Sequence, residues 1–69
     1  MFDKIFRFEA RIVDDKGTDG RITGEIIAVL NLTKDKHRKW VEDNIKQGAW
    51  NRNKIWIKEI YIESIIRVG

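Results

Sequence analysis

The sequence predicts a small α+β domain of ββαβ order, in which a three-stranded antiparallel sheet carries one helix on one face. Three observations predict it. Two segments with alternating apolar residues flank a turn-rich stretch, an amphipathic segment follows them, and a run dense in Ile, Trp and Tyr comes last. We expect residues 1–69 to form a single domain, because 69 residues is near the lower size limit for independent folding.

The first strand is predicted over residues 2–13, because Phe6, Phe8 and Ala10 alternate with charged residues. Residues 14–20 contain two glycines and three aspartates, which is typical of a turn. The second strand is predicted over residues 22–32. It is apolar on both faces, and a glycine within it, Gly24, indicates a bulge or a close backbone approach.

A helix is predicted over residues 34–47. Thr33 is suited to cap its N-terminus, and Gly48 is suited to end it in a left-handed conformation. At about 100° per residue the apolar stripe of this helix is thin, and Trp40 is its main anchor. The third strand is predicted over residues 54–68, where isoleucine, tryptophan and tyrosine dominate.

A right-handed crossover from the second strand to the third places the first strand in the middle, which gives the sheet order 2-1-3 with antiparallel neighbours. Strict alternation along the strands then leaves apolar residues on the face that the helix does not cover. Because such a surface is costly to expose to water, we expect another chain to cover it in a homo-oligomer. The predicted oligomer interface consists of Ile27, Val29, Ile55, Ile57, Tyr61 and Ile65.

Composition excludes several classes of protein. The chain has no cysteine, so disulfides and cysteine-containing zinc sites are excluded, and a reducing, cytoplasmic location is expected. No N-terminal apolar run resembles a secretion signal. The longest uncharged stretch, residues 26–33, is far shorter than the roughly 20 residues of a membrane span, so no membrane contact is expected.

Catalysis is not expected, because the chain has a single histidine, His37, and a single serine, Ser64, with no spacing that supports a nucleophile and its base. A packed histidine is the preferred interpretation of His37. The glycines of residues 17–24 lack the helix and the Lys-Ser/Thr pair of a phosphate loop, and the nearby aspartates lack the closing glutamate of a calcium loop. Glu59 and Glu63 are interpreted as exposed strand residues. No metal site and no cofactor are predicted.

Positive charge is concentrated in the second half of the chain. Residues 1–32 contain five basic and six acidic side chains (−1), and residues 33–69 contain nine basic and five acidic ones (+4). Cations at a helix N-terminus oppose the helix dipole, so Lys36, Arg38 and Lys39 are candidate contacts for a phosphate or an acidic partner. The alternative is a solvated face on which these cations pair with acids four residues away.

Residues 48–58 form the strongest candidate binding segment, because they combine two tryptophans with three cations and contain no acid. Three interpretations remain open: packing of the tryptophans within the domain, a protein interface, and a nucleic-acid site. The candidate binding residues of this segment are Trp50, Arg52, Lys54, Trp56 and Lys58.

These observations predict a small binding or inhibitor-type module that acts through protein–protein contacts as a homo-oligomer. Compact chains of this size are common in phages and mobile elements, which is an association with size alone. One alternative is a nucleic-acid-binding domain that uses the basic and aromatic segment. The other is capture of a small anionic ligand, such as a nucleotide, at a subunit interface.

Overall fold

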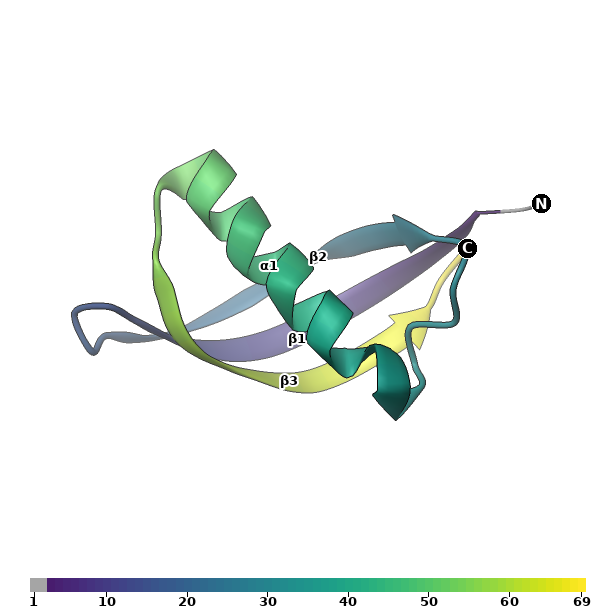
Figure 1. Cartoon of the computed structure of the whole chain (residues 1–69), viewed down its shortest axis with the longest axis horizontal. Helices are drawn as coiled ribbons and strands as arrows, with labels where there is room; N and C mark the ends of the chain where they lie inside the picture. Colours follow the sequence, from purple (N-terminus) through teal and green to yellow (C-terminus); the bar gives the residue numbers. More distant parts are fainter. Residues whose placement is uncertain (1–2) are drawn as a thin grey trace.

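The computed structural model describes residues 3–69 and confirms the predicted architecture, a three-stranded antiparallel sheet of order β2-β1-β3 with a single helix (Figure 1). Phe2, where the first strand was predicted to begin, lies outside the described residues. The helices and strands are β1 (Lys4–Asp14), β2 (Asp19–Ala28), the 3-10 turn η1 (Asp35–His37), α1 (Arg38–Asn53) and β3 (Ile57–Arg67).

The hairpin of β1 and β2 has an unbroken register from the Lys4–Ala28 pair to the Val13–Asp19 pair. Its turn is held by the Asp14 carboxylate, whose Oδ1 atom accepts hydrogen bonds from the N–H groups of Lys16 at 2.9 Å and Thr18 at 2.8 Å. Side-chain acceptors of this kind replace the ladder partners that the backbone lacks in a turn. The turn predicted from the glycines and aspartates is therefore confirmed.

The second strand ends four residues earlier than predicted. Ala28 is paired with Lys4, the first residue of β1, so the residues after Ala28 have no strand to pair with. They leave the sheet as a bend, and Leu32 returns its side chain to the core from this loop, where it is completely buried. The apolar run of residues 22–32 therefore consists of part of a strand and a loop that a buried leucine attaches to the core.

The helix is displaced toward the C-terminus relative to the prediction. The hydroxyl of Thr33 donates to Asn31 Oδ1 at 2.6 Å instead of capping a helix, and α1 begins at Arg38. Gly48 lies within the helix, which ends where Lys54 adopts a left-handed conformation with φ 56°. The reason for the extension is the buried stripe of α1, which continues past Gly48: Val41, Ile45 and Ala49.

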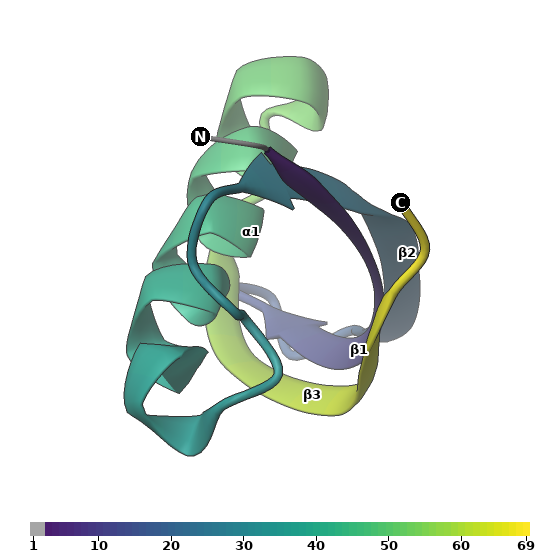
Figure 2. The same ribbon diagram turned by 90° about the vertical axis from the view of Figure 1, so that its right-hand side faces the viewer.

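The core lies between α1 and one face of the sheet, and Figure 2 shows the helix along that face. Of the three strands, β3 lies closest to α1. Trp40 is not the anchor of the helix, because it is 41% exposed. The buried core consists of Phe6, Phe8, Ala10, Ile12, Ile26, Leu32, Val41, Ile45, Ala49 and Ile57.

Two irregularities in the pairing of β1 with β3 change which residues of β3 face the helix. Between the Asp14–Ile57 and Val13–Glu59 pairs, β3 has one extra residue, Lys58. A second extra residue, Glu63, lies further along β3, between the partners of Ala10 and Glu9. Each bulge shifts the alternation of side chains by one position.

The prediction that Ile57 and Ile65 lie on the outer face of the sheet is therefore wrong. Ile57 is 6% exposed and belongs to the core, and Ile65 is partly buried against it. The bulges bring the core-facing isoleucines of β3 onto one face, although they do not follow a strict period of two: Ile57, Ile60, Ile62 and Ile65. One face of the sheet therefore carries isoleucines that strict alternation would divide between its two faces.

Gly24 is a site of close approach, as predicted, and the bulges lie elsewhere. A Cβ atom built on Gly24 would lie 3.0 Å from Phe8 Cζ and 3.1 Å from Phe8 Cε1. The φ angle of Gly24 is not positive, so the ring and not the backbone conformation requires glycine here.

Replacing Gly48 with alanine is expected to stabilise the domain by about 0.5–1 kcal/mol, because glycine in a helix interior costs that much relative to alanine. Nothing lies within 4 Å of a Cβ atom placed there. The free energy of unfolding from urea titrations followed by circular dichroism measures the change. Gly17→Ala is the matched control: at φ 83° it should destabilise the protein, and a loss of stability in Gly48→Ala would contradict the helical assignment.

Candidate functional site

The candidate binding segment, residues 48–58, crosses from the last turns of α1 to the start of β3. Lys54 ends the helix, and its N–H donates to the carbonyl oxygen of Trp50 at 3.0 Å, while the Ile55 N–H donates to the Ala49 carbonyl at 3.3 Å. Next to the strand, the Trp56 carbonyl accepts a hydrogen bond from the N–H of Asp15 at 3.0 Å. The segment is thus fixed both to the helix and to the β1–β2 turn.

This anchoring brings the two tryptophans of the segment together. The ring centroids of Trp50 and Trp56 are 5.9 Å apart with an interplanar angle of 83°, an edge-to-face arrangement that aromatic pairs prefer. Trp50 is 44% exposed and Trp56 is 60% exposed, so neither is a core residue. The ammonium group of Lys54 lies 5.4 Å from the centroid of the Trp50 ring, within the range of a cation–π interaction.

A cavity of about 280 Å³ opens beside this pair, and we call it the tryptophan groove. One wall of the groove is formed by residues on one face of α1, because positions three, four and seven residues apart lie on the same side of a helix. The predicted site lacked this wall, although the spacing of its residues is visible in the sequence. The groove is lined by Asp43, Lys46, Gln47, Trp50, Ile55, Trp56 and Ile57.

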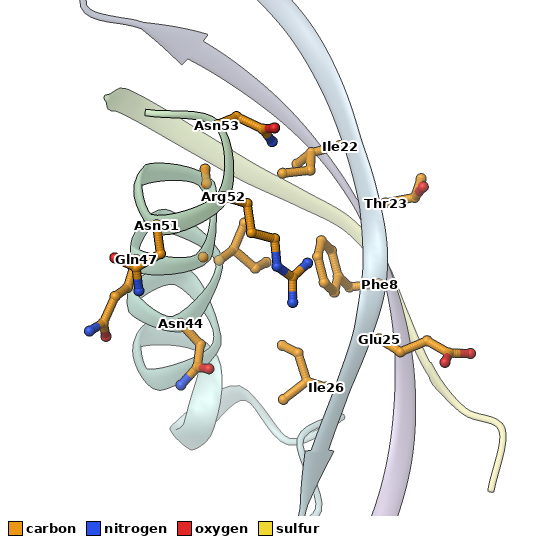
Figure 3. Close-up of a pocket in the computed structure, with 13 residues that line it drawn as sticks. Phe8, Ile22, Thr23, Glu25, Ile26, Asn44, Gln47, Asn51, Arg52 and Asn53 are labelled. Atoms are coloured by element: carbon orange, nitrogen blue, oxygen red, sulfur yellow. The ribbon is translucent and has the colours of Figure 1, made fainter. Parts of the chain in front are cut away.

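Two cations of the segment lie away from the groove. Arg52 lines a second cavity, of about 300 Å³, between α1 and β2, which we call the α1–β2 cleft. Figure 3 shows the Arg52 side chain extending from the helix across this cleft toward the strands, on the side where Phe8, Ile22 and Ile26 lie. Lys58 is the exposed extra residue of the first bulge in β3. The structure therefore gathers Trp50, Lys54 and Trp56 but not the other two predicted contacts.

The basic residues near the start of α1 form a separate feature. From Lys36 to Trp50 the chain runs about 20 Å along the helix axis, at roughly 1.5 Å per residue. Arg38 lies 3.6 Å from the Asp35 carboxylate and donates to the Ile62 carbonyl at 3.5 Å, and Lys39 lies 3.6 Å from the Asp43 carboxylate. Lys39 is thus paired with an acid four residues away, as the alternative interpretation anticipated, whereas the acid beside Arg38 is three residues away. Lys36 is exposed.

The outer face of the sheet, opposite α1, is largely charged. Three ion pairs cross its middle: Arg7–Glu25 at 3.4 Å, Arg11–Asp19 at 3.3 Å and Arg21–Glu63 at 3.1 Å. The Arg11 guanidinium carbon also lies 4.7 Å from the centroid of the Tyr61 ring. Among residues 3–69, the middle of this face therefore lacks the continuous apolar surface from which the sequence predicted an oligomer interface.

The predicted interface residues are distributed over several surfaces. Ile27 is 64% exposed, Val29 is 42% exposed and Tyr61 is 46% exposed, whereas Ile55 lines the tryptophan groove. With Ile57 in the core, the set does not form one patch.

Glu59, one of the paired carboxylates of the last strand, is engaged by its neighbour. The Tyr61 hydroxyl donates a hydrogen bond to Glu59 Oε1 at 2.9 Å. This hydrogen bond, together with the negative charge of the carboxylate, raises the pKa of Tyr61 above its ordinary value of 10.0. Glu63 pairs instead with Arg21, so the two carboxylates have separate partners.

Across residues 3–69, no helix combines the length and the apolar character that crossing a membrane requires. Comparison with protein-family models, with curated proteins and with solved structures finds no match to this chain. The site is therefore interpreted from its own geometry.

Proposed function

We propose that this chain is a protein-binding module whose contact surface is the tryptophan groove. The observation that supports the proposal is the exposed, edge-to-face pair of Trp50 and Trp56 beside an apolar cavity, in a segment that hydrogen bonds fix at both ends. Tryptophans that are already held in place lose little conformational entropy on binding. Tryptophan is also enriched among the residues that contribute most of the binding energy at protein interfaces.

The charge around the groove favours an acidic partner. Lys46 lines it and the Lys54 ammonium group lies over the Trp50 ring. Asp43, the one acid that lines the groove among the described residues, already lies 3.6 Å from the Lys39 ammonium group. An interface of apolar centre and polar rim suits a protein segment that inserts an apolar side chain between flanking carboxylates. We propose such an acidic segment as the partner.

The action that follows from this geometry is occlusion of the partner's surface, as in an inhibitor, without chemistry of its own. The cysteine-free composition is compatible with a reducing, cytoplasmic location, and we place the partner there.

Nucleic-acid binding is the second candidate, supported by the excess of positive charge in residues 33–69. Base stacking needs an open aromatic face. The pair is arranged edge to face, and Lys54 lies over the Trp50 ring, so a base would have to displace the ammonium group. This arrangement favours the protein partner over a stacked base.

The experiment is selection of random peptides from a display library on the immobilised full chain. We expect the selected peptides to contain an aromatic or aliphatic residue flanked by Asp or Glu, and to lose at least about tenfold in affinity for Trp56→Ala, because interface tryptophans commonly contribute that much. Trp40→Ala is the matched control, since Trp40 is comparably exposed at 41% but does not line the groove. Peptides equally sensitive to both variants would contradict the proposal.

A parallel arm titrates single-stranded and duplex oligonucleotides against tryptophan fluorescence at low salt. Micromolar binding that weakens steeply with salt and is lost in Trp56→Ala would favour the nucleic-acid function instead, because counterion release drives such binding. Absence of quenching is the result that we expect.

A further inference from the structure

The outer edge of β2 is unpaired among the described residues, because the sheet order places β2 at one side. The Asp14 N–H donates to the Thr18 carbonyl at 3.1 Å, which identifies this as a hydrogen-bonded pair of the hairpin. Such pairs recur every second residue in an antiparallel ladder. The backbone N–H and C=O groups of Arg21, Thr23 and Glu25 therefore point away from β1, toward the open edge.

The face of β2 that looks toward α1 alternates between small and large residues: Gly20, Ile22, Gly24 and Ile26. Figure 3 shows Ile22 and Ile26 on the helix side of the strand and Thr23 and Glu25 on the other. Phe8 accounts for Gly24, but not for Gly20: a Cβ atom there would lie 3.8 Å from Ile12, an ordinary contact, and its φ angle is not positive. The second glycine therefore has no explanation within the chain.

On the outer face of β2, a basic and an acidic residue are placed symmetrically about Thr23, which affects how this edge can pair with another strand. Arg21 and Glu25 are each two residues from Thr23, on opposite sides of it. In an antiparallel pair of two copies of β2 centred on Thr23, each Arg21 would lie directly opposite the Glu25 of the other copy. Opposite charges across a strand pair stabilise it, and like charges destabilise it.

We propose that β2 pairs with β2 of a second copy of this chain, antiparallel and centred on Thr23, to form a six-stranded sheet with twofold symmetry. In this register each Ile22 lies opposite a Gly24, and each Ile26 lies opposite a Gly20, so large residues meet small ones at every helix-side position. The same register aligns the two Arg21–Glu25 pairs and matches the outward hydrogen-bonding groups of both strands.

The two neighbouring registers that keep the same hydrogen bonds match the side chains of the two strands less well in size and charge. A shift of two residues in one direction sets Ile22 against Ile22 and Asp19 against Glu25. A shift in the other direction sets Ile22 against Ile26 and removes both Arg21–Glu25 pairs. The pattern of size and charge on β2 thus selects a second copy in a single register, a self-complementarity that an unrelated partner strand would not require.

Pairing in this register also changes the α1–β2 cleft. The Ile22 side chain of the second copy would lie next to Gly24 and against the ring of Phe8, which lines the cleft with Ile26. The cavity of about 300 Å³ would then have an apolar group of the second copy beside its β2 wall. This inference uses surfaces that are separate from the tryptophan groove, so it does not rest on the proposed function.

The test is a charge exchange followed by sedimentation equilibrium over a range of concentrations. The wild-type chain of 8.2 kDa is expected to reach twice that mass with a micromolar dissociation constant, since one strand pair buries less than the roughly 1,600 Å² of a standard interface. Arg21→Glu alone and Glu25→Arg alone are each expected to remain monomeric. An equimolar mixture of the two variants is expected to form a heterodimer, because both charge pairs are restored across the edge.

Lys58→Glu is the control, because it makes the same change of charge at an exposed residue of β3, on the far side of the central strand from β2. It is expected to leave dimerisation unchanged. A mixture that associates no better than the single variants, or a Lys58→Glu chain as monomeric as Arg21→Glu, would overturn the proposal. The ion pairs of Arg21 and Glu25 within the chain are exposed and contribute little to folding, so the variants should keep the native circular dichroism spectrum.

Hydrogen exchange on the wild-type chain provides a measurement that needs no variant. The amide hydrogens of Arg21, Thr23 and Glu25 are expected to exchange slowly at millimolar protein and rapidly on dilution, while those of Ile22 and Gly24 stay protected throughout. Free exchange of the three outward amides at every concentration would refute the strand pairing.

Discussion

The Phe6→Ala variant is expected to lose about 3–5 kcal/mol of folding free energy, the usual cost of truncating a fully buried phenylalanine. Phe6 is 1% exposed and lies on the central strand, between Ile26 of β2 and Arg67 of β3. A domain of this length has a total stability of only about 3–10 kcal/mol at roughly 0.05–0.15 kcal/mol per residue. A large part of the Phe6→Ala population should therefore be unfolded at 25 °C.

Thermal unfolding followed by circular dichroism measures this effect. Phe6→Leu is the matched control, because it keeps most of the apolar volume and should cost much less than the alanine variant. A Phe6→Ala protein with the melting temperature of the wild type would contradict the position of this ring at the centre of the core.

The Ile57→Ala variant is expected to lose about 2–5 kcal/mol, and Ile55→Ala less than about 1 kcal/mol. Strict alternation treats the two isoleucines alike, because they are two residues apart. In the structure Ile57 is 6% exposed and packs in the core, whereas Ile55 is 36% exposed beside the tryptophan groove. The difference in unfolding free energy between the variants therefore tests whether the chain enters the core at Ile57, where β3 begins.

Urea unfolding of both variants, with the same probe and the same buffer, gives the comparison. A second pair extends it along the strand: Ile65→Ala should destabilise the domain more than Ile66→Ala, since Ile66 is 51% exposed. A larger loss for Ile66→Ala than for Ile65→Ala would indicate that β3 follows a regular period of two and would place the register shifts in error.

The order and pairing of the strands could be predicted from the sequence, because turn-forming residues, strand alternation and the handedness of crossovers are local or general rules. The residues at which the helix and the strands begin and end could not be predicted in this way. Gly48 is a good helix terminator by type, yet the burial of Ala49 one residue later stabilises a further turn. Packing against the sheet decided that position, and packing is not a property of the isolated segment.

The face assignment of β3 failed for a different reason. Two extra residues, Lys58 and Glu63, interrupt the pairing, and each reverses the faces of the residues beyond it. Their charges are visible in the sequence, but a charged residue in a strand is equally compatible with the outer face. In the same way, the tryptophans of residues 48–58 were identified from composition, whereas Asp43 and Gln47 became part of the groove only through the length of α1.

The two surfaces proposed above would act together. The groove lies between α1 and the start of β3, and the pairing edge belongs to β2 on the other side of the central strand. A dimer would therefore present two grooves without covering either. Against a partner that repeats its acidic segment, two linked sites bind more tightly than one by avidity alone.

The central position of β1 has a consequence for how the protein is made. Its strand is synthesised first, but one of its two neighbours, β3, is completed only at Arg67. Until then Phe8 and Ala10 lie in a half-built sheet, because their partners Ile65 and Ile62 come from the last strand. A nascent chain on the ribosome can form the hairpin early, but its core closes in one late step, and in that interval the β1 surface is available to chaperones.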